Sequence, residues 1–182
     1  MNASNAVFHQ RCADRGFKNN NPAMFASHIM NMKSESMKYT VKEKEKEWIR
    51  REVHHLYHDC DVNCASTMLH CLSVLFSMPV SDDVFASALG MHGAGYYRAQ
   101  CGLVEGTLMF IGLYGWKIGS SRDEIVSLCY GFAEAFEKEF SSLRCRELRP
   151  GGFSESDPPH LCENLTVEAI IFSYGYLRLQ FS

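Results

Sequence analysis

The chain contains eight cysteines, and four of them are placed so that they could form one chemical site. A thiolate is both a nucleophile and a soft metal ligand, and four thiolates are a natural donor set for an iron–sulfur cluster or a tetrahedral zinc ion. Two dithiol pairs that cycle between thiol and disulfide would need the same convergence. We refer to these four residues as the four-cysteine set: Cys64, Cys101, Cys145 and Cys162.

Helices must position these thiols, because apolar residues recur at helical spacing along most of the chain after residue 40. No alternation of strands and helices is visible, so we predict an all-α fold, a compact helical bundle. The predicted helices cover residues 41–59, 63–78, 81–89, 101–115 and 121–140, with a last helix that begins at 157–158.

Local signals mark two of these helices. The helix over 63–78 is apolar around most of its circumference, which predicts a central, buried position. Ser121, followed three residues later by Glu124, forms a capping-box pattern at the start of the clearest amphipathic helix in the chain.

The C-terminal part is predicted to consist of a loop, a helix and a tail. Residues 149–159 are rich in Gly, Ser and Pro, which is typical of a surface loop. Asp157 and Pro158 then supply a cap and a first helical residue. Residues 176–181 alternate in part between apolar and polar side chains, so we expect a short extended tail there.

Three members of the four-cysteine set fall near the predicted start of a helix, namely Cys64, Cys101 and Cys162. Unpaired backbone N–H groups and the positive end of the helix dipole stabilise a thiolate at such positions. We therefore expect the pKa of these thiols to be lowered toward neutrality. Cys145 lies just past a predicted helix end, where a turn could bring it inward.

The spacing of the set leaves its chemistry open. No two of its members form a CxxC pair, the compact arrangement by which many metal sites are recognised. A bound metal or cluster and a reversible dithiol therefore remain equal alternatives. Free cysteine also packs well as a small hydrophobe, which is the purely structural alternative.

The residues around these cysteines resemble a known family. The order runs from Asn63-Cys64-Ala65 through a glycine-containing loop to Cys101-Gly102-Leu103-Val104-Glu105-Gly106, then Cys145-Arg146-Glu147-Leu148 and Cys162. Over about residues 53–177 the chain is similar to the family of “putative redox-active” proteins named for its C_GCAxxG_C_C pattern. Leu103 stands where that family has alanine, and the loop before Cys101 keeps only some of its glycines.

The resemblance implies roles for six residues. The four cysteines that the family shares map onto the four-cysteine set, as redox-active groups or as ligands of an iron–sulfur cluster or zinc. The family's glycine motif maps onto residues 101–106, so Gly102 and Gly106 are expected to lie against a cofactor. The family has no assigned substrate, so the resemblance implies none.

The remaining cysteines are expected to be structural. Cys60, Cys71 and Cys129 are interpreted as core or peripheral thiols, because Cys71 lies on the apolar helix and Cys129 on an apolar helix face. Cys12 belongs to the N-terminal region and receives no role.

Two histidines and a glycine-rich loop have weaker functional interpretations. His54 and His58 lie one helical turn apart near Cys60 and Cys64, but no Glu follows the first histidine to complete an HExxH motif. We expect solvated or partly packed histidines rather than zinc ligands. The loop over 90–95 lacks the Lys-Ser/Thr ending of a phosphate-binding loop and is interpreted as a connector.

Charge and hydrophobicity argue against several classes of partner. A net charge of -3 and a pI near 6.2 give no large positive field, so we expect no nucleic-acid partner. The apolar stretch over 108–116 is shorter than the about 20 residues of a membrane span, so we expect no membrane insertion.

The N-terminal region shapes the expected location and domain organisation. Residues 1–40 show no helical or alternating period, so we predict a poorly ordered extension before a cysteine-containing helical domain over 41–182. The start lacks the apolar region of a secretion signal, which predicts a cytoplasmic protein. Lasting structural disulfides are rare in that compartment, which favours metal or redox roles for cysteine.

These observations lead to one functional hypothesis and one rival. The hypothesis is a redox-active or metal-binding protein whose four-cysteine set holds an iron–sulfur cluster, another thiolate-bound metal or a reversible disulfide. Glu105 and Arg146 are its expected polar neighbours, and its redox partner is unidentified. The rival is a non-catalytic helical interaction module, for example a homodimer, in which cysteines and glycines only permit close packing. The sequence assigns no enzyme class.

Overall fold

The computed structural model describes residues 40–154, 156–158 and 160–181, and the regular structure in these ranges is helical. The helices are α2 (Glu43–His58), α3 (Cys64–Leu75), α4 (Asp82–Ser87), α5 (Gly102–Lys117), α6 (Arg122–Phe140), α7 (Cys145–Leu148) and α8 (Glu163–Gln180). The all-α prediction is confirmed. The predicted extension lies outside the described residues, apart from Thr40. Of the helices in these ranges, none has the combination of length and hydropathy required of a membrane-spanning helix.

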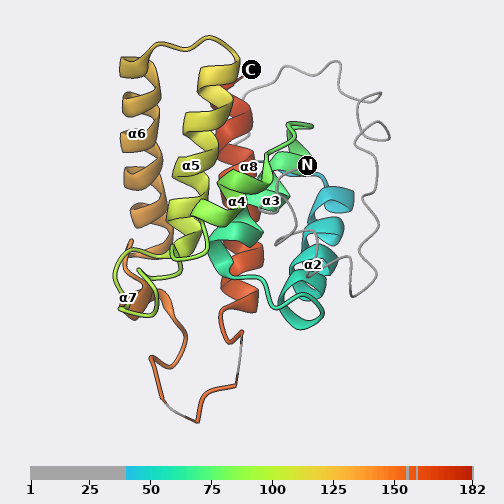
Figure 1. The fold of residues 1–182 in the computed structure, drawn as a ribbon, viewed down its shortest axis with the longest axis vertical. Helices are drawn as coiled ribbons and strands as arrows, with labels where there is room; N and C mark the ends of the chain where they lie inside the picture. Colours follow the sequence, from blue (N-terminus) through green and yellow to red (C-terminus); the bar gives the residue numbers. More distant parts are fainter. Residues whose placement is uncertain (1–39, 155, 159, 182) are drawn as a thin grey trace.

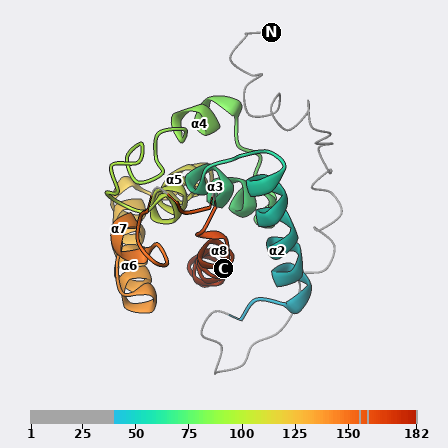
Figure 2. The ribbon, with the colours of Figure 1, turned by 90° about the horizontal axis from the view of Figure 1, so that it is seen from below.

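Helix α8 occupies the middle of the bundle. Figure 2 shows it nearly end-on, with α2 on one side, α6 on the other, and α3 and α5 along a third side. In Figure 1, α5, α6 and α8 run side by side, and each packs against the other two. Because helices border α8 on three sides, its first residues lie close to several other elements at one end of the bundle.

Helix α3 is the buried helix that the sequence predicts. Every residue from Ala65 to Ser73 is buried. It packs closely on α5, because a Cβ at Gly106 would overlap the carbonyl oxygen of Ala65. The glycine therefore permits a short distance between the two helix backbones.

Helix α6 begins with the predicted capping box. The N–H of Ser121 donates to Oε2 of Glu124 at 2.7 Å, and the N–H of Glu124 donates to Oγ of Ser121 at 3.3 Å. On the inner face of α6, Phe132 and Phe136 are fully buried and contact Phe172 of α8, with ring centroids 6.3 and 6.1 Å apart. This aromatic layer fixes α6 against α8.

The predicted start of the last helix is wrong. The carboxylate of Asp157 accepts hydrogen bonds from the N–H of Ser154 at 2.9 Å and from Arg149 at 3.2 Å, so it holds the loop instead of capping a helix. His160 then adopts a left-handed φ of 61°, which interrupts helical backbone. Helix α8 begins later, with Cys162 as its N-cap.

The predicted extended tail is also wrong, because α8 continues to Gln180. Tyr176 and Leu177 are buried within it, and the ring of Phe181 packs on Tyr114 of α5 with centroids 4.7 Å apart. Tertiary packing of these side chains outweighs the partial alternation in the sequence.

Candidate functional site

Each member of the four-cysteine set stands at the start of a helix. Cys64 is the first residue of α3, and Cys101 and Cys162 are the N-caps of α5 and α8. Cys145, predicted to lie just past a helix end, is the first residue of the four-residue helix α7. The fold therefore brings four helix starts to the same end of the bundle.

Backbone hydrogen bonds join the segments that carry Cys101 and Cys145. The N–H of Cys101 donates to the carbonyl oxygen of Leu143 at 2.8 Å, and the N–H of Cys145 donates to that of Ala99 at 2.7 Å. These two bonds lie on either side of an isolated antiparallel β-bridge between Gln100 and Arg144. Successive residues of extended backbone point to opposite faces, so both cysteines lie on the same face of this short pairing.

Two glycines let the backbone pass directly beside the thiols. A Cβ at Gly102 would overlap the Sγ of Cys64, and a Cβ at Gly93 would lie 3.2 Å from the Sγ of Cys145. Gly93 also has a φ of +68°, which glycine adopts without strain. Gly106 faces α3 instead. The role of Gly102 and Gly106 in binding a cofactor stays a prediction.

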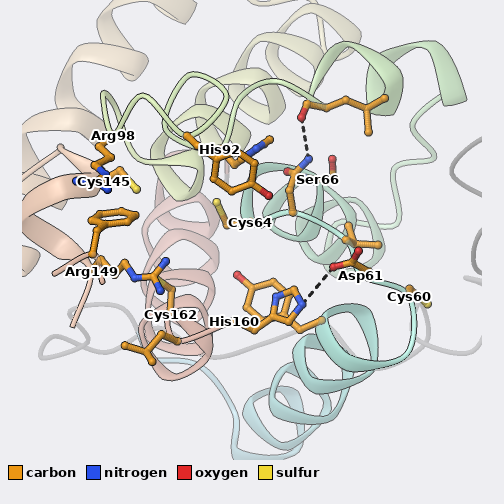
Figure 3. Close-up of a pocket in the computed structure, with 17 residues that line it drawn as sticks. Cys60, Asp61, Cys64, Ser66, His92, Arg98, Cys145, Arg149, His160 and Cys162 are labelled. Atoms are coloured by element: carbon orange, nitrogen blue, oxygen red, sulfur yellow. Dashed lines mark hydrogen bonds and ion pairs between the residues drawn. The ribbon is translucent and has the colours of Figure 1, made fainter. Parts of the chain in front are cut away.

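A pocket of about 410 Å³, which we call the thiol pocket, lies beside the set. Its wall includes Cys64, Cys145 and Cys162, as Figure 3 shows. Cys101 is buried next to it, with 5% of its surface exposed. The volume falls within the range of small-ligand sites, so the pocket gives a ligand access to three of the four thiols.

The four thiols are within electrostatic reach of one another. Burial is the largest cause that raises the pKa of Cys64, and the other three thiols of the set raise it further. Burial also raises the pKa of Cys101 to about 12, and Cys145 and Cys162 shift it in the same direction. The structure thus brings together the four residues singled out in the sequence, while their ligand or redox role stays a prediction.

The predicted direction of the thiol pKa is wrong. Burial raises the pKa of all four thiols above the ordinary value. Backbone hydrogen bonds from Leu103 and Val104 at the start of α5 do lower the pKa of Cys101, but burial has the larger effect. The helix starts are present as predicted, whereas the depth at which packing places each thiol is not visible in the sequence.

Comparison with known families decides where the chain belongs. Residues 62–174, more than half of the chain, match the family described as “Putative redox-active protein (C_GCAxxG_C_C)”. The chain belongs to this family. The resemblance seen in the sequence is therefore confirmed, and the matched range contains the whole four-cysteine set. No curated protein and no solved structure matches the chain.

Two arginines at the thiol pocket of this C_GCAxxG_C_C family member were not anticipated. The guanidinium groups of Arg98 and Arg149 lie 4.4 and 4.6 Å from the ring centroid of Phe153, and all three residues line the pocket (Figure 3). Burial raises the pKa of Cys145, and both arginines lower it; Arg149 also lowers that of Cys162. Each arginine could have been noticed in the sequence as a basic residue close to a cysteine of the set. Arg98 lies a few positions before Cys101, and Arg149 lies a few positions after Cys145.

The two polar neighbours predicted for the set do not line the thiol pocket. Neither Glu105 nor Arg146 is among the described residues that line the thiol pocket. Arg146 donates through Nε to the carbonyl oxygen of Arg98 at 3.3 Å, so it supports the segment that carries Arg98. Glu105 is half-buried on α5, where burial raises its pKa.

The thiol pocket also carries polar atoms without hydrogen-bond partners in the described part of the chain. Both ring nitrogens of His92 and the Nε of Arg149 are buried and unpaired there. Buried polar groups are nearly always hydrogen-bonded in native proteins. These three atoms are therefore exceptions to that rule, and they belong to residues of the pocket wall.

The cysteines outside the set have the structural positions that the sequence suggests. Cys60 is buried at the wall of the thiol pocket, and its Sγ lies 3.7 Å from Nε2 of His55. Cys71 is fully buried on α3, and Cys129 is half-buried on α6. No disulfide joins the cysteines of the described ranges, and Cys12 lies outside them.

Proposed function

We propose that this C_GCAxxG_C_C protein is a redox protein whose four-cysteine set binds an iron–sulfur cluster. The observation that supports it is the convergence of four thiols, from four separate helix starts, beside one pocket. Four cysteine thiolates are the common ligands of iron–sulfur clusters. Zinc accepts the same donors but has no redox chemistry, so the redox-active description of the family favours the cluster.

The electrostatics of the set fit a bound cation. Burial raises the pKa of each thiol, and other thiols of the set raise the pKa of Cys64, Cys101 and Cys162 further, so the free thiols are protonated at neutral pH. A bound metal ion compensates the negative charge of the thiolates that hold it, and its binding releases the thiol protons. A cluster would supply one-electron transfer, while Arg98 and Arg149 would offset the remaining negative charge on the pocket side.

The position of the set suggests how electrons would reach it. Three of its thiols line the thiol pocket, whereas Cys101 is buried in the protein and does not line it. A small substrate or an edge of an electron-transfer partner would approach through the pocket. We place this activity in the cytoplasm, where reducing conditions keep unligated thiols available.

A reversible disulfide between Cys145 and Cys162 is the second candidate. Burial raises the pKa of both thiols, but Arg149 opposes this shift, which makes them the more reactive members of the set. One thiolate would attack a disulfide of a partner protein and form a mixed disulfide, and the second would displace the partner's remaining thiolate. Two electrons pass to the partner, whose disulfide becomes two thiols by taking up two protons.

Anaerobic purification followed by iron and acid-labile sulfide analysis tests the proposal. We expect iron and sulfide in equal amounts and a visible absorbance that dithionite bleaches. Replacing any member of the set by Ser should strongly lower the iron content. Cys129→Ser is the matched control, because Cys129 is half-buried on α6 and does not line the thiol pocket.

The other outcomes separate the remaining candidates. A colourless, metal-free protein overturns the cluster. If Cys145 and Cys162 then pair reversibly under mild oxidation, the dithiol function stands. If no thiols pair, and replacing the whole set by Ser changes only the free energy of unfolding, the helical interaction module stands instead.

A further inference from the structure

A second group of ligand-type side chains lies where α2 meets α8, outside the four-cysteine set. His54 and His58 are four residues apart in the last two turns of α2, so they share one helix face. Glu163 is the first residue of α8, which packs against α2. The histidines noted in the sequence near Cys60 and Cys64 thus contact a carboxylate that is distant in the chain.

The three side chains converge on a small volume. Nδ1 of His54 lies 2.9 Å from Oε1 of Glu163, and Nε2 of His58 lies 2.9 Å from Oε2. The two imidazole rings are 4.5 Å apart between centroids. One donor atom from each of the three residues lies within 4.8 Å of the other two. Each carboxylate oxygen therefore faces a different imidazole nitrogen.

We propose that His54, His58 and Glu163 bind a divalent transition-metal ion of the zinc type. Two imidazole nitrogens and one carboxylate oxygen suit Zn²⁺ and its first-row neighbours, whereas Ca²⁺ and Mg²⁺ prefer oxygen ligands. Three protein ligands leave a coordination position for water or another ligand. This site uses no cysteine, so it does not depend on the proposed cluster.

The surroundings favour a cation that enters from solvent. The side chains of His54 and His58 are 67% and 39% exposed, so an ion can reach them. The site lies at the C-terminal end of α2, whose dipole favours positive charge there, while the dipole of α8 at Glu163 acts in the opposite direction. The nearby His160 ring contacts His58 edge-on at 5.5 Å and pairs with Asp61 at 3.4 Å.

Metal binding here would link two helices next to the thiol pocket. The ion would join the C-terminal end of α2 to the first residue of α8. Cys162, the N-cap of α8, immediately precedes Glu163. The ion would therefore hold the backbone of one member of the four-cysteine set in place.

A Zn²⁺ titration against a chromophoric chelator tests the site. The protein is purified anaerobically with its cysteines intact, so any metal already held by thiolates is counted first. We expect one further equivalent of Zn²⁺ in the wild type, and an affinity at least tenfold lower after His54→Ala, His58→Ala or Glu163→Gln. His55→Ala is the matched control on the same helix, because His55 bonds Asp59 instead of Glu163.

Co²⁺ gives a readout that separates this site from the thiols. Co²⁺ bound here should show ligand-field bands without a thiolate-to-metal charge-transfer band. The proposal is overturned if the wild type binds added Zn²⁺ no more tightly than the His54→Ala/His58→Ala variant, with circular dichroism confirming that both are folded. It is also overturned if the Co²⁺ equivalent that is lost in the His54→Ala/His58→Ala variant shows thiolate ligation. A protein without a cluster that still binds this histidine-dependent equivalent would refute the proposed function and leave this site standing.

Discussion

Gly102 and Cys64 touch where α5 meets α3, so closely that a Cβ at position 102 would overlap the Sγ of Cys64. The same Cβ would lie 2.9 Å from the carbonyl oxygen of Met91, in the loop before α5. Three segments therefore meet at one glycine. This contact sets the distance between the starts of α3 and α5, each of which carries a thiol of the set.

Gly102→Ala should therefore displace the Cys64 thiol. We expect a loss of about 1–3 kcal/mol in the free energy of unfolding, because the added methyl overpacks a buried site, together with a lower iron content. Urea denaturation and iron analysis measure the two effects.

Two other glycines of α5 are matched controls for that variant. Gly106→Ala would meet the α3 backbone without touching a thiol, so it should cost stability and keep the iron content per folded protein. A methyl group at Gly112 would enter open space among the described residues, so Gly112→Ala should stabilise the helix by about 0.8–1 kcal/mol. Wild-type iron content in Gly102→Ala would contradict the importance of the contact.

The metal-free protein should lose stability as pH rises above the ordinary thiol range. Burial raises the pKa of Cys64 and Cys101 in the folded state, so above about pH 8.5 the unfolded chain loses thiol protons that the folded chain retains. The free energy of unfolding should fall by up to about 1.4 kcal/mol per pH unit for each thiol. Urea denaturation from pH 7 to 10 measures the slope, which should be shallower in Cys64→Ser/Cys101→Ser. Equal slopes would show that these thiols are not buried as described.

Arg149→Gln should make the pocket thiols less reactive. Removing the guanidinium removes the charge that lowers the pKa of Cys145 and Cys162, so their alkylation by iodoacetamide in the metal-free protein should slow severalfold at pH 8. Asp157→Asn is the control, since it weakens the contact to Arg149 but leaves the arginine charge in place. Peptide mass spectrometry follows each thiol separately. Similar slowing in both variants would attribute the effect to loop packing.

The aromatic layer between α6 and α8 should carry much of the stability. Phe136→Ala should cost about 3–5 kcal/mol, because the side chain is fully buried. Tyr130 lies on the same helix with 70% of its surface exposed, so Tyr130→Ala should change the free energy of unfolding by about 0.5 kcal/mol or less. Thermal or urea denaturation compares the two. A small effect of Phe136→Ala would mean that α6 does not depend on this layer.

Much of the fold could be predicted from the sequence because its signals are local. The capping box at Ser121 and the mostly apolar circumference of α3 depend on residues a few positions apart. The start of α8 could not be predicted, because the carboxylate of Asp157 is used by Arg149 and Ser154. Only the tertiary structure shows that these hydrogen bonds occupy the carboxylate, so that it does not cap the helix.

The proximity of the four cysteines could be expected from the sequence, but the electrostatics of their thiols could not. The placement of Cys64, Cys101 and Cys162 near helix starts follows from helix boundaries, which the sequence marks. The pKa direction depends on burial depth, which periodicity does not provide. Glu163, the partner of two histidines on α2, lies more than a hundred residues away in the chain, so no local pattern connects them.

Anomalous diffraction at the iron edge from crystals of the anaerobically purified protein tests the central claim most directly. We expect the iron atoms to lie together in one site. The Sγ atoms of Cys64, Cys101, Cys145 and Cys162 should bind them at an iron–sulfur distance of about 2.3 Å, which is typical of a metal–thiolate bond. Iron bound to other residues, or four thiols that are far apart and surrounded by apolar side chains, would contradict it.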